Sequence, residues 1–181
     1  MPHVLTPLTE PYPPEAAEIL KTYPQQGGYL LTLFRTFANS VRFLKKGVAN
    51  LLDADSPLTL RQREIVILRT TANRDCEYEW GVHVAAFAKR AELSDEQVRA
   101  TRLEDSIAPC WAPEEQTLVR AVDELCSHAR IEDATLAAVQ ETFTRDQQLE
   151  ILALVGNYHT VSFVANTARL AAEPFAARFP D

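Results

Sequence analysis

The sequence of 181 residues contains little cysteine and no long apolar run. Its three cysteines, Cys76, Cys110 and Cys126, are too few and too widely spaced for a disulfide framework, and their odd number leaves at least one thiol free within a chain. No stretch approaches the roughly 20 uninterrupted apolar residues of a membrane span, and the first residues lack the charged-then-apolar plan of a signal peptide. We therefore expect a cytoplasmic protein with no membrane partner.

Positive charge is also scarce. Acidic residues outnumber basic ones 25 to 18, which gives a formal net charge of −7. Because binding to a phosphate backbone needs a concentrated positive surface, nucleic acid is not an expected partner. The apolar fraction of 46% and the charged fraction of 24% are those of an ordinary globular protein, which excludes intrinsic disorder. The length is that of about one domain, so we expect a single domain over residues 1–181.

Proline is absent from two long blocks, residues 58–108 and 114–173, which together contain only two glycines, Gly81 and Gly156. A proline inside a helix costs ~3 kcal/mol, so long segments without proline are expected to be helical. Six of the eleven prolines precede residue 25. Residues 1–14 are therefore expected to form an extended arm that leads into a short helix.

Three Ser/Thr-x-x-Gln capping boxes, which begin at Thr59, Ser94 and Thr144, predict three helix starts. No convincing alternation typical of a strand is present. The expected helices are Glu15–Tyr23, a pair between Tyr29 and Leu52, Leu60–Asn73, Cys76–Ala91, one that follows Ser94, Pro113–Ala129, Asp133–Phe143 and Arg145–Leu170. The sequence thus predicts an all-α antiparallel helical bundle. Weak similarity between the segments after Thr59 and Thr144 is compatible with a duplicated helical hairpin and equally with chance.

Cys76, Glu79 and His83 are spaced at i, i+3 and i+7, which places a thiol, a carboxylate and an imidazole on one face of a helix. An adjacent imidazole and a helix N-terminus both lower the pKa of a thiol, so we predict that Cys76 is the most reactive of the three cysteines. Glu64 lies on the preceding helix. A short connection at residues 73–75 would fold that helix back so that Glu64 approaches the same spot.

The run Arg63-Glu64, followed twelve residues after the glutamate by Cys76-Glu-Tyr-Glu-Trp-Gly-Val-His83, resembles the carboxymuconolactone decarboxylase family, which includes the alkylhydroperoxidase D proteins. The resemblance is strong over residues 58–100. It implies an all-α fold that assembles into homotrimers or homohexamers, with Glu64 as a relay acid, Cys76 as the first cysteine of a Cys-x-x-Cys pair and His83 as a relay histidine. Glu79 replaces the second cysteine, so the disulfide cycle of the alkylhydroperoxidase branch cannot run.

Two mechanisms remain open for this variant of the motif. As a thiol peroxidase, Glu64 and His83 would deprotonate Cys76, whose thiolate attacks a hydroperoxide, and an external thiol would then reduce the sulfenic acid. As a decarboxylase of a lactone acid, Glu79 and His83 would protonate the carbanion as carbon dioxide leaves. Neither mechanism requires a metal or another cofactor. A third hypothesis is a non-catalytic helical oligomer with an unreactive Cys76.

A decarboxylase would also need a cation for the substrate carboxylate, which Arg63, Arg69 or Arg74 could supply. Tyr78 and Trp80 are candidate substrate-binding residues together with Arg63, although aromatic side chains in this position more often serve packing. The alternative interpretation makes Cys76 a small buried hydrophobe and His83 a core histidine bonded to Glu79. Cys110 and Cys126 are expected to be structural, and His159 with Tyr158 either lines a pocket or belongs to the core.

Overall fold

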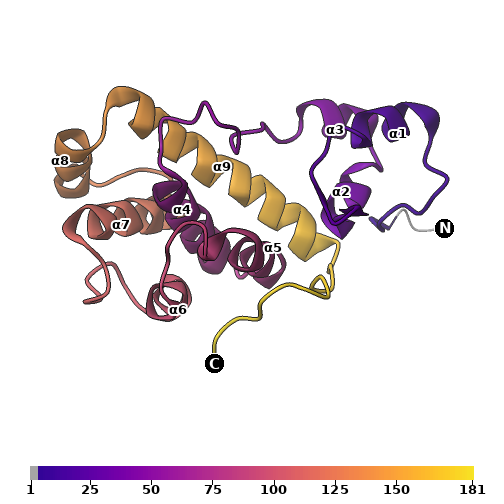
Figure 1. The fold of residues 1–181 in the computed structure, drawn as a ribbon. Coiled ribbons are helices and arrows are strands. Elements are labelled where there is room, and N and C mark those ends of the chain that lie inside the picture. The colour runs from indigo at the N-terminus through magenta and orange to yellow at the C-terminus, as the bar shows by residue number, and fades with distance from the viewer. Residues whose placement is uncertain (1–3) are drawn as a thin grey trace.

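The computed structural model describes residues 4–181 and shows a bundle of helices with a smaller helical lobe at one end (Figure 1). The lobe contains α1 (Pro14–Leu20), α2 (Thr32–Phe37) and α3 (Val41–Lys46), and a two-residue antiparallel pair of β1 (Gln25–Gln26) and β2 (Tyr29–Leu30). The bundle contains α4 (Leu60–Asn73), α5 (Glu77–His83), the π-helix η1 (Val84–Ala88), α6 (Asp95–Leu103), α7 (Pro113–His128), α8 (Asp133–Thr142) and α9 (Arg145–Thr167). The all-α prediction is confirmed.

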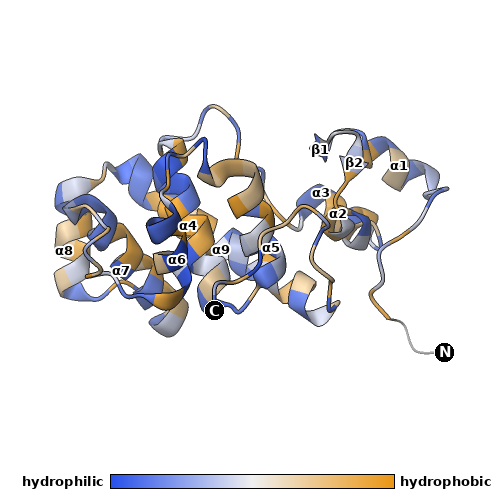
Figure 2. Cartoon of the chain, turned by 60° about the horizontal axis from the view of Figure 1, so that its bottom comes forward, coloured by the Kyte–Doolittle hydropathy of each residue, from blue (hydrophilic) through white to orange (hydrophobic). Residues whose placement is uncertain are grey.

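Helix α4 is the centre of the bundle and packs against α5, α6, α7 and α9. Its run Ile65–Leu68 is fully buried, which explains why four apolar residues in a row occur on a helix. Figure 2 shows this apolar centre enclosed by helices with polar outer faces. The position of α4 matters for function, because every helix that contributes to the site described below contacts it.

The three predicted capping boxes are present, and in each the Ser or Thr side chain accepts from the backbone amide of the glutamine three residues later. Three predicted helices differ from the structure by more than one residue at an end. The helix expected over Glu15–Tyr23 is Pro14–Leu20. The helix expected over Cys76–Ala91 has Cys76 as its N-cap and changes to a π-helix after His83. The helix expected to reach Leu170 ends at Thr167, because Arg169 takes a positive φ of 52°.

The lobe is tied to the bundle by the carboxylate of Glu173, which is buried in the segment after α9. It accepts hydrogen bonds from the Tyr29 hydroxyl at 2.9 Å, the Thr32 amide at 2.6 Å and the Tyr78 hydroxyl at 2.5 Å. One side chain thus joins the lobe, α5 and the C-terminal segment. Residues 4–13 contain no helix, in agreement with the predicted arm, whose first three residues lie outside the described part of the chain.

The C-terminal segment crosses α5 at Gly81. The amide of Ala177 donates to the Gly81 carbonyl at 3.1 Å, and the ring of Phe179 packs against Trp80 with centroids 5.2 Å apart. A Cβ atom on Gly81 would lie 2.1 Å from the Ala177 carbonyl oxygen, whereas a Cβ on Gly156, in the middle of α9, would meet nothing within 4 Å. Gly81 is therefore tightly packed against the C-terminal segment, whereas Gly156 has open space beside it.

This contrast predicts opposite effects of the same substitution. Gly81→Ala should destabilise the protein by about 1–3 kcal/mol, because the new methyl group must displace the C-terminal segment. Gly156→Ala should stabilise it by up to about 1 kcal/mol, because alanine favours a helix interior and the site is open. Thermal unfolding of the two variants measures both effects, and a shift of the same sign in both would contradict the packing described for Gly81.

Within the described residues, no helix combines the length and the apolar character that crossing a membrane requires. Three large apolar side chains on α9, those of Leu149, Leu152 and Phe163, are exposed. The homotrimer or homohexamer stays a prediction.

Candidate functional site

Three polar side chains, one from each of three helices, converge on the imidazole of His83, the last residue of α5. Its Nδ1 atom donates to Oε2 of Glu64 on α4 at 2.8 Å, and its Nε2 atom lies 2.8 Å from the hydroxyl of Tyr158 on α9. The Oε2 atom of Glu79 is 3.7 Å from the same Nε2. Glu64, Glu79, His83 and Tyr158 are all at most 7% exposed. The structure therefore brings together three of the four predicted catalytic residues and adds a tyrosine.

Local geometry explains this convergence. Glu79 and His83 are four residues apart on α5 and therefore face the same side of that helix. Glu64 reaches them because α4 and α5 are joined by a connection of three residues, in which Asp75 takes a positive φ of 51°. Tyr158 reaches them because α9 packs against both α4 and α5. The predicted approach of Glu64 across a short connection is what the structure contains.

Burial and mutual charge control the proton affinities in the cluster. Burial raises the pKa of Glu79 to about 6, against the opposing effect of the His83 charge. Burial alone would lower the pKa of His83, but the adjacent Glu64 carboxylate outweighs it and raises that pKa above its ordinary value. Burial, with the charges of Glu79 and Glu64, raises the pKa of Tyr158 well above 10. These shifts favour the protonated imidazole and the neutral phenol, and they bring the pKa of the Glu79 carboxyl group closer to neutral pH.

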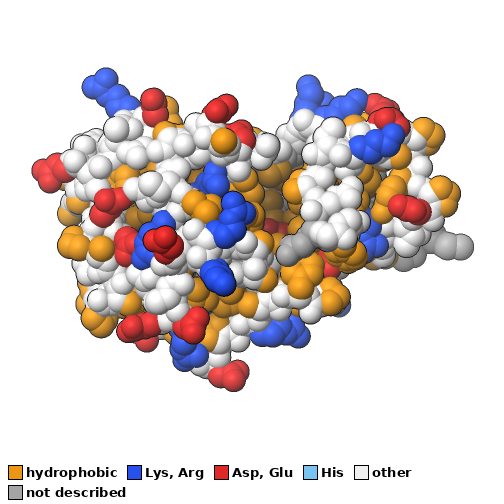
Figure 3. Space-filling model, viewed as in Figure 1, with side chains coloured by type: hydrophobic (Ala, Val, Ile, Leu, Met, Phe, Trp, Pro, Cys, Tyr) orange, Lys and Arg blue, Asp and Glu red, His pale blue; other side chains and the backbone are white. Residues whose placement is uncertain are grey.

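Three buried polar atoms around His83 have no hydrogen-bond partner among residues 4–181: Arg63 Nε, Glu64 Oε1 and Glu79 Oε1. Buried polar atoms in folded proteins are nearly always paired, so these three are available to a polar ligand. Arg63 is half-buried, and its charge acts on the pKa of His83 and of Tyr158. In the space-filling view the surface is hollowed between the lobe and the bundle, where Figure 1 shows α5 and the C-terminal half of α9 (Figure 3).

Cys76 lies at the opposite end of α5 from His83. It is the N-cap residue, it is 0% exposed, and its sulfur makes no hydrogen bond to His83 in the described structure. Burial raises the pKa of the thiol to about 11, and the nearby Glu79 carboxylate adds to that rise, whereas the Glu79 amide and the Ser162 hydroxyl oppose it. The thiol therefore lacks the activation that its position before a helix suggests in the sequence.

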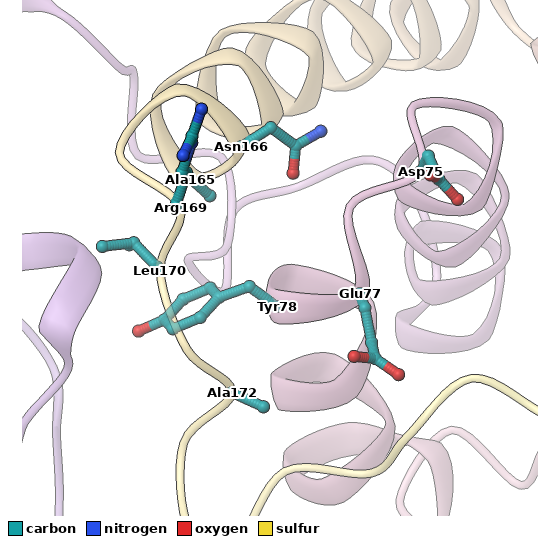
Figure 4. A pocket seen from close by; sticks show the side chains of 8 residues that line it. All are labelled: Asp75, Glu77, Tyr78, Ala165, Asn166, Arg169, Leu170 and Ala172. Atoms are coloured by element: carbon teal, nitrogen blue, oxygen red, sulfur yellow. The ribbon is translucent and has the colours of Figure 1, made fainter.

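Tyr78 and Trp80 have partners outside the cluster. The Tyr78 hydroxyl accepts from the Leu33 amide and donates to Glu173, and Trp80 Nε1 donates to the Thr101 hydroxyl. Tyr78 also lines a surface pocket of about 360 Å³ at the end of α9 (Figure 4). That pocket is lined by Asp75, Glu77, Tyr78, Ala165, Asn166, Arg169, Leu170 and Ala172, none of which belongs to the His83 cluster. A substrate-binding role for the two aromatic residues stays a prediction.

The three arginines proposed as substrate cations differ in their surroundings. Arg69 is 8% exposed and forms two hydrogen bonds with Asp123, at 2.6 and 2.8 Å, so its charge is already paired. Arg63 and Arg74 form no ion pair within residues 4–181. Of these, only the Arg63 charge acts on His83. In the described part of the chain, no group of three or more His, Cys, Asp or Glu residues is arranged to hold a metal ion.

The predicted catalytic and substrate-binding residues do not include Tyr158, which is expected from the sequence only to line a pocket or belong to the core with His159. It is 75 residues from His83 in the chain, and its contact depends on how α9 packs rather than on any local motif. One signal was available: Tyr158 lies at a helical spacing from the buried residues Ile151, Leu154 and Val161, and among these positions it alone carries a polar atom.

The raised pKa of Glu79 predicts how stability changes with pH. Because the folded state holds this proton up to about pH 6 and the unfolded state only up to about 4.5, the free energy of unfolding should fall by about 2 kcal/mol as pH rises through that interval. Glu79→Gln removes this dependence. Between about pH 4 and about pH 7, denaturant unfolding should therefore show a smaller loss of unfolding free energy in the variant than in the wild type. Equal losses of unfolding free energy would contradict the burial of an ionisable Glu79.

Several solved structures share this fold, whereas no curated protein matches the chain in sequence. An uncharacterised peroxidase-related protein from Silicibacter sp. TM1040 superposes with a TM-score of 0.78 at 17% identity, over 99% of this chain and 100% of that one. An alkylhydroperoxidase AhpD core protein from Ralstonia eutropha JMP134 gives 0.74 at 18% identity, over 96% and 95%. The apo debrominase Bmp8 gives 0.74 at 17% identity, over 96% and 94%. At such low identity these likenesses show the fold alone.

A family match covers the segment that supplies most of the site. Residues 41–124 match the carboxymuconolactone decarboxylase family, and they include Arg63, Glu64, Cys76, Glu79 and His83. The fold of the whole chain is that of alkylhydroperoxidase D-like structures. Residues 41–124 are thus similar to the carboxymuconolactone decarboxylase family, and the chain as a whole has the alkylhydroperoxidase D-like fold.

Proposed function

We propose that the chain is an acid–base enzyme that protonates a carbon atom of a small organic acid as carbon dioxide leaves, which is the reaction for which the matching family is named. The observation that carries this proposal is the carboxyl group of Glu79. It is buried, its pKa is raised to about 6, and its Oε1 atom has no partner among the described residues. A general acid works best when its pKa lies near the working pH.

The proposed step uses the residues around His83. The bond between the substrate carbon and its carboxylate breaks, carbon dioxide leaves, and the electron pair remains on the conjugated carbon skeleton. Glu79 then donates its proton to that carbon and becomes a carboxylate. The protonated imidazole of His83, 3.7 Å away and held by Glu64 and Tyr158, returns a proton to Glu79.

Arg63 is the proposed group for binding the substrate's anionic oxygens. It lies one residue before Glu64, its Nε atom has no hydrogen-bond partner in the described structure, and its Nη1 atom donates only to the Asp53 carbonyl. A guanidinium group suits a carboxylate because it offers two parallel donors. In this proposal the substrate enters from the hollow between the lobe and the bundle (Figure 3).

The thiol-peroxidase hypothesis stays a prediction with weaker support. It requires Cys76 to act as a thiolate, whereas the sulfur is fully buried and burial raises its pKa to about 11. The geometry favours proton transfer at Glu79 over nucleophilic attack by Cys76. Cys76→Ser should therefore leave decarboxylation in place and would abolish a peroxidase activity.

Carboxymuconolactone is the probe for the proposal. The wild-type protein should release carbon dioxide from it and, in deuterated water, should place one deuterium on the protonated carbon of the product. Cys76→Ser should retain both the release of carbon dioxide and the incorporation of deuterium. Absence of carbon dioxide release from the folded wild-type protein would overturn the proposal, and consumption of cumene hydroperoxide with oxidation of Cys76 would replace it with the peroxidase.

A further inference from the structure

A second pair of thiol and imidazole lies outside the His83 cluster. The sulfur of Cys126 on α7 is 3.3 Å from Nε2 of His159 on α9. Both residues are partly exposed, unlike Cys76. The two helices are in contact, so the pair is held by the bundle rather than by a flexible loop.

An unpaired cation accompanies this pair. The charge of Arg74 acts on both Cys126 and His159, and Arg74 forms no ion pair within residues 4–181. Its Nε atom is buried and has no hydrogen-bond partner there, whereas its carbonyl is held by the side chain of Asn166. The side-chain amide of the adjacent Asn73 donates to Asp123, which lies one helical turn before Cys126 on α7. Cys126 and His159 are therefore in direct contact, and the charge of Arg74 acts on both.

The protonation states of Cys126 and His159 suit a thiol that a neighbouring base deprotonates as it reacts. Burial and the nearby Asp123 carboxylate raise the pKa of Cys126, whereas the Asn73 amide and the charges of Arg74 and Arg69 act against that rise. Burial and the Arg74 charge lower the pKa of His159. At neutral pH the pair is thus a thiol that donates to a neutral imidazole, and the imidazole can take the proton as the sulfur attacks.

We propose that Cys126, His159 and Arg74 form a site for thiol–disulfide exchange with a small disulfide that carries carboxylates. The Cys126 sulfur attacks one sulfur of the disulfide, and its proton passes to His159. A new bond forms between Cys126 and the attacked sulfur, the original disulfide bond breaks, and the departing thiolate takes the proton from His159. One disulfide is exchanged for another, so no further oxidant or reductant is needed. Arg74 binds a carboxylate of the incoming molecule.

The other two cysteines lack this combination. Cys76 is fully buried. Cys110 is partly exposed, but its charged neighbours are the carboxylates of Glu96, Glu115 and Glu104, which disfavour a thiolate and repel an anion. We therefore expect Cys126 to be modified first, although the sequence predicts that Cys76 is the most reactive thiol.

The experiment compares two disulfides of opposite charge on the full-length, reduced, folded protein. Glutathione disulfide carries carboxylates, whereas cystamine carries two amines and no carboxylate. Peptide mass spectrometry over time should show that glutathione disulfide modifies Cys126 at least about tenfold faster than it modifies Cys110. It should also modify Cys126 faster than cystamine does, once each rate is corrected for the reactivity of that disulfide toward free cysteine. Cys76 should stay unmodified, which reports that the fold is intact.

Two variants separate the roles. His159→Gln should slow the modification of Cys126 by both disulfides by about tenfold or more and leave Cys110 unchanged. Arg74→Gln should remove the preference for glutathione disulfide with little effect on cystamine. Equal rates at Cys126 and Cys110, or no charge preference in the wild-type protein, would overturn the proposal without any variant. An unaltered Cys126 rate in folded His159→Gln would overturn the role of the imidazole and with it the site.

Discussion

Glu79→Gln should lower the turnover of carboxymuconolactone by about 10²-fold or more, because the amide cannot donate the proton that a general acid supplies. The change keeps the size of the side chain. The matched control is Glu77→Gln, two residues earlier on the same helix, where the carboxylate binds Arg178 and the Phe179 amide outside the cluster. Steady-state rates of carbon dioxide release measure both variants, and the Glu77 variant should keep the wild-type rate.

The pH profile of the wild-type enzyme gives an independent check on the same group. Glu79 must be protonated to act, so kcat should fall as pH rises above about 6. A profile that instead rises with pH would indicate an ionised thiol or base as the reactive group. Equal activity in Glu79→Gln and in the wild type would exclude Glu79 as the acid.

Arg69→Ala should destabilise the protein by about 3–5 kcal/mol, the range expected when one partner of a buried ion pair is removed. The Arg69 guanidinium forms two hydrogen bonds with Asp123 and also donates to the carbonyls of Thr101 and Glu104 at the end of α6. Its loss leaves the Asp123 carboxylate with the Asn73 amide but without a cation, and it removes the donors at the end of α6. Denaturant unfolding at neutral pH measures the change.

The matched control for this variant is Arg130→Ala. Arg130 forms an ion pair with Glu132 at 3.1 Å, but its side chain is 72% exposed. Exposed pairs of this kind contribute about 0–1 kcal/mol, so the control should change stability little. Similar losses in both variants would contradict the view that Arg69 joins α4, α6 and α7 from a buried position.

Local side-chain chemistry explains why much of the fold could be predicted. Thr59, Ser94 and Thr144 each satisfy the first free amides of a helix, and such signals depend only on neighbouring residues. The end of α9 could not be located in this way. It is set by a positive φ at Arg169, a position where the sequence offers no glycine to indicate it.

The site was predictable where spacing along one helix decides contact. Glu79 and His83 are four residues apart, and Glu64 approaches across a short turn. The placement of Cys76 differs because the helix begins one residue later than expected, so that Cys76 is the N-cap residue and its thiol does not join the polar face of the helix. Tyr158 and the pair of Cys126 with His159 required the packing of α9 on the bundle, which no local pattern encodes.

The three hydrogen bonds of Glu173 have a consequence for how the chain folds during synthesis. They join residues 144, 141 and 95 positions apart, and they involve the final segment of the chain. Contacts of such long sequence separation form late, because a large loop must close before they stabilise anything. On the ribosome, the contacts of Glu173 with the lobe and α5 are missing, and the face of Trp80 that Phe179 covers stays open, until Glu173 and Phe179 emerge.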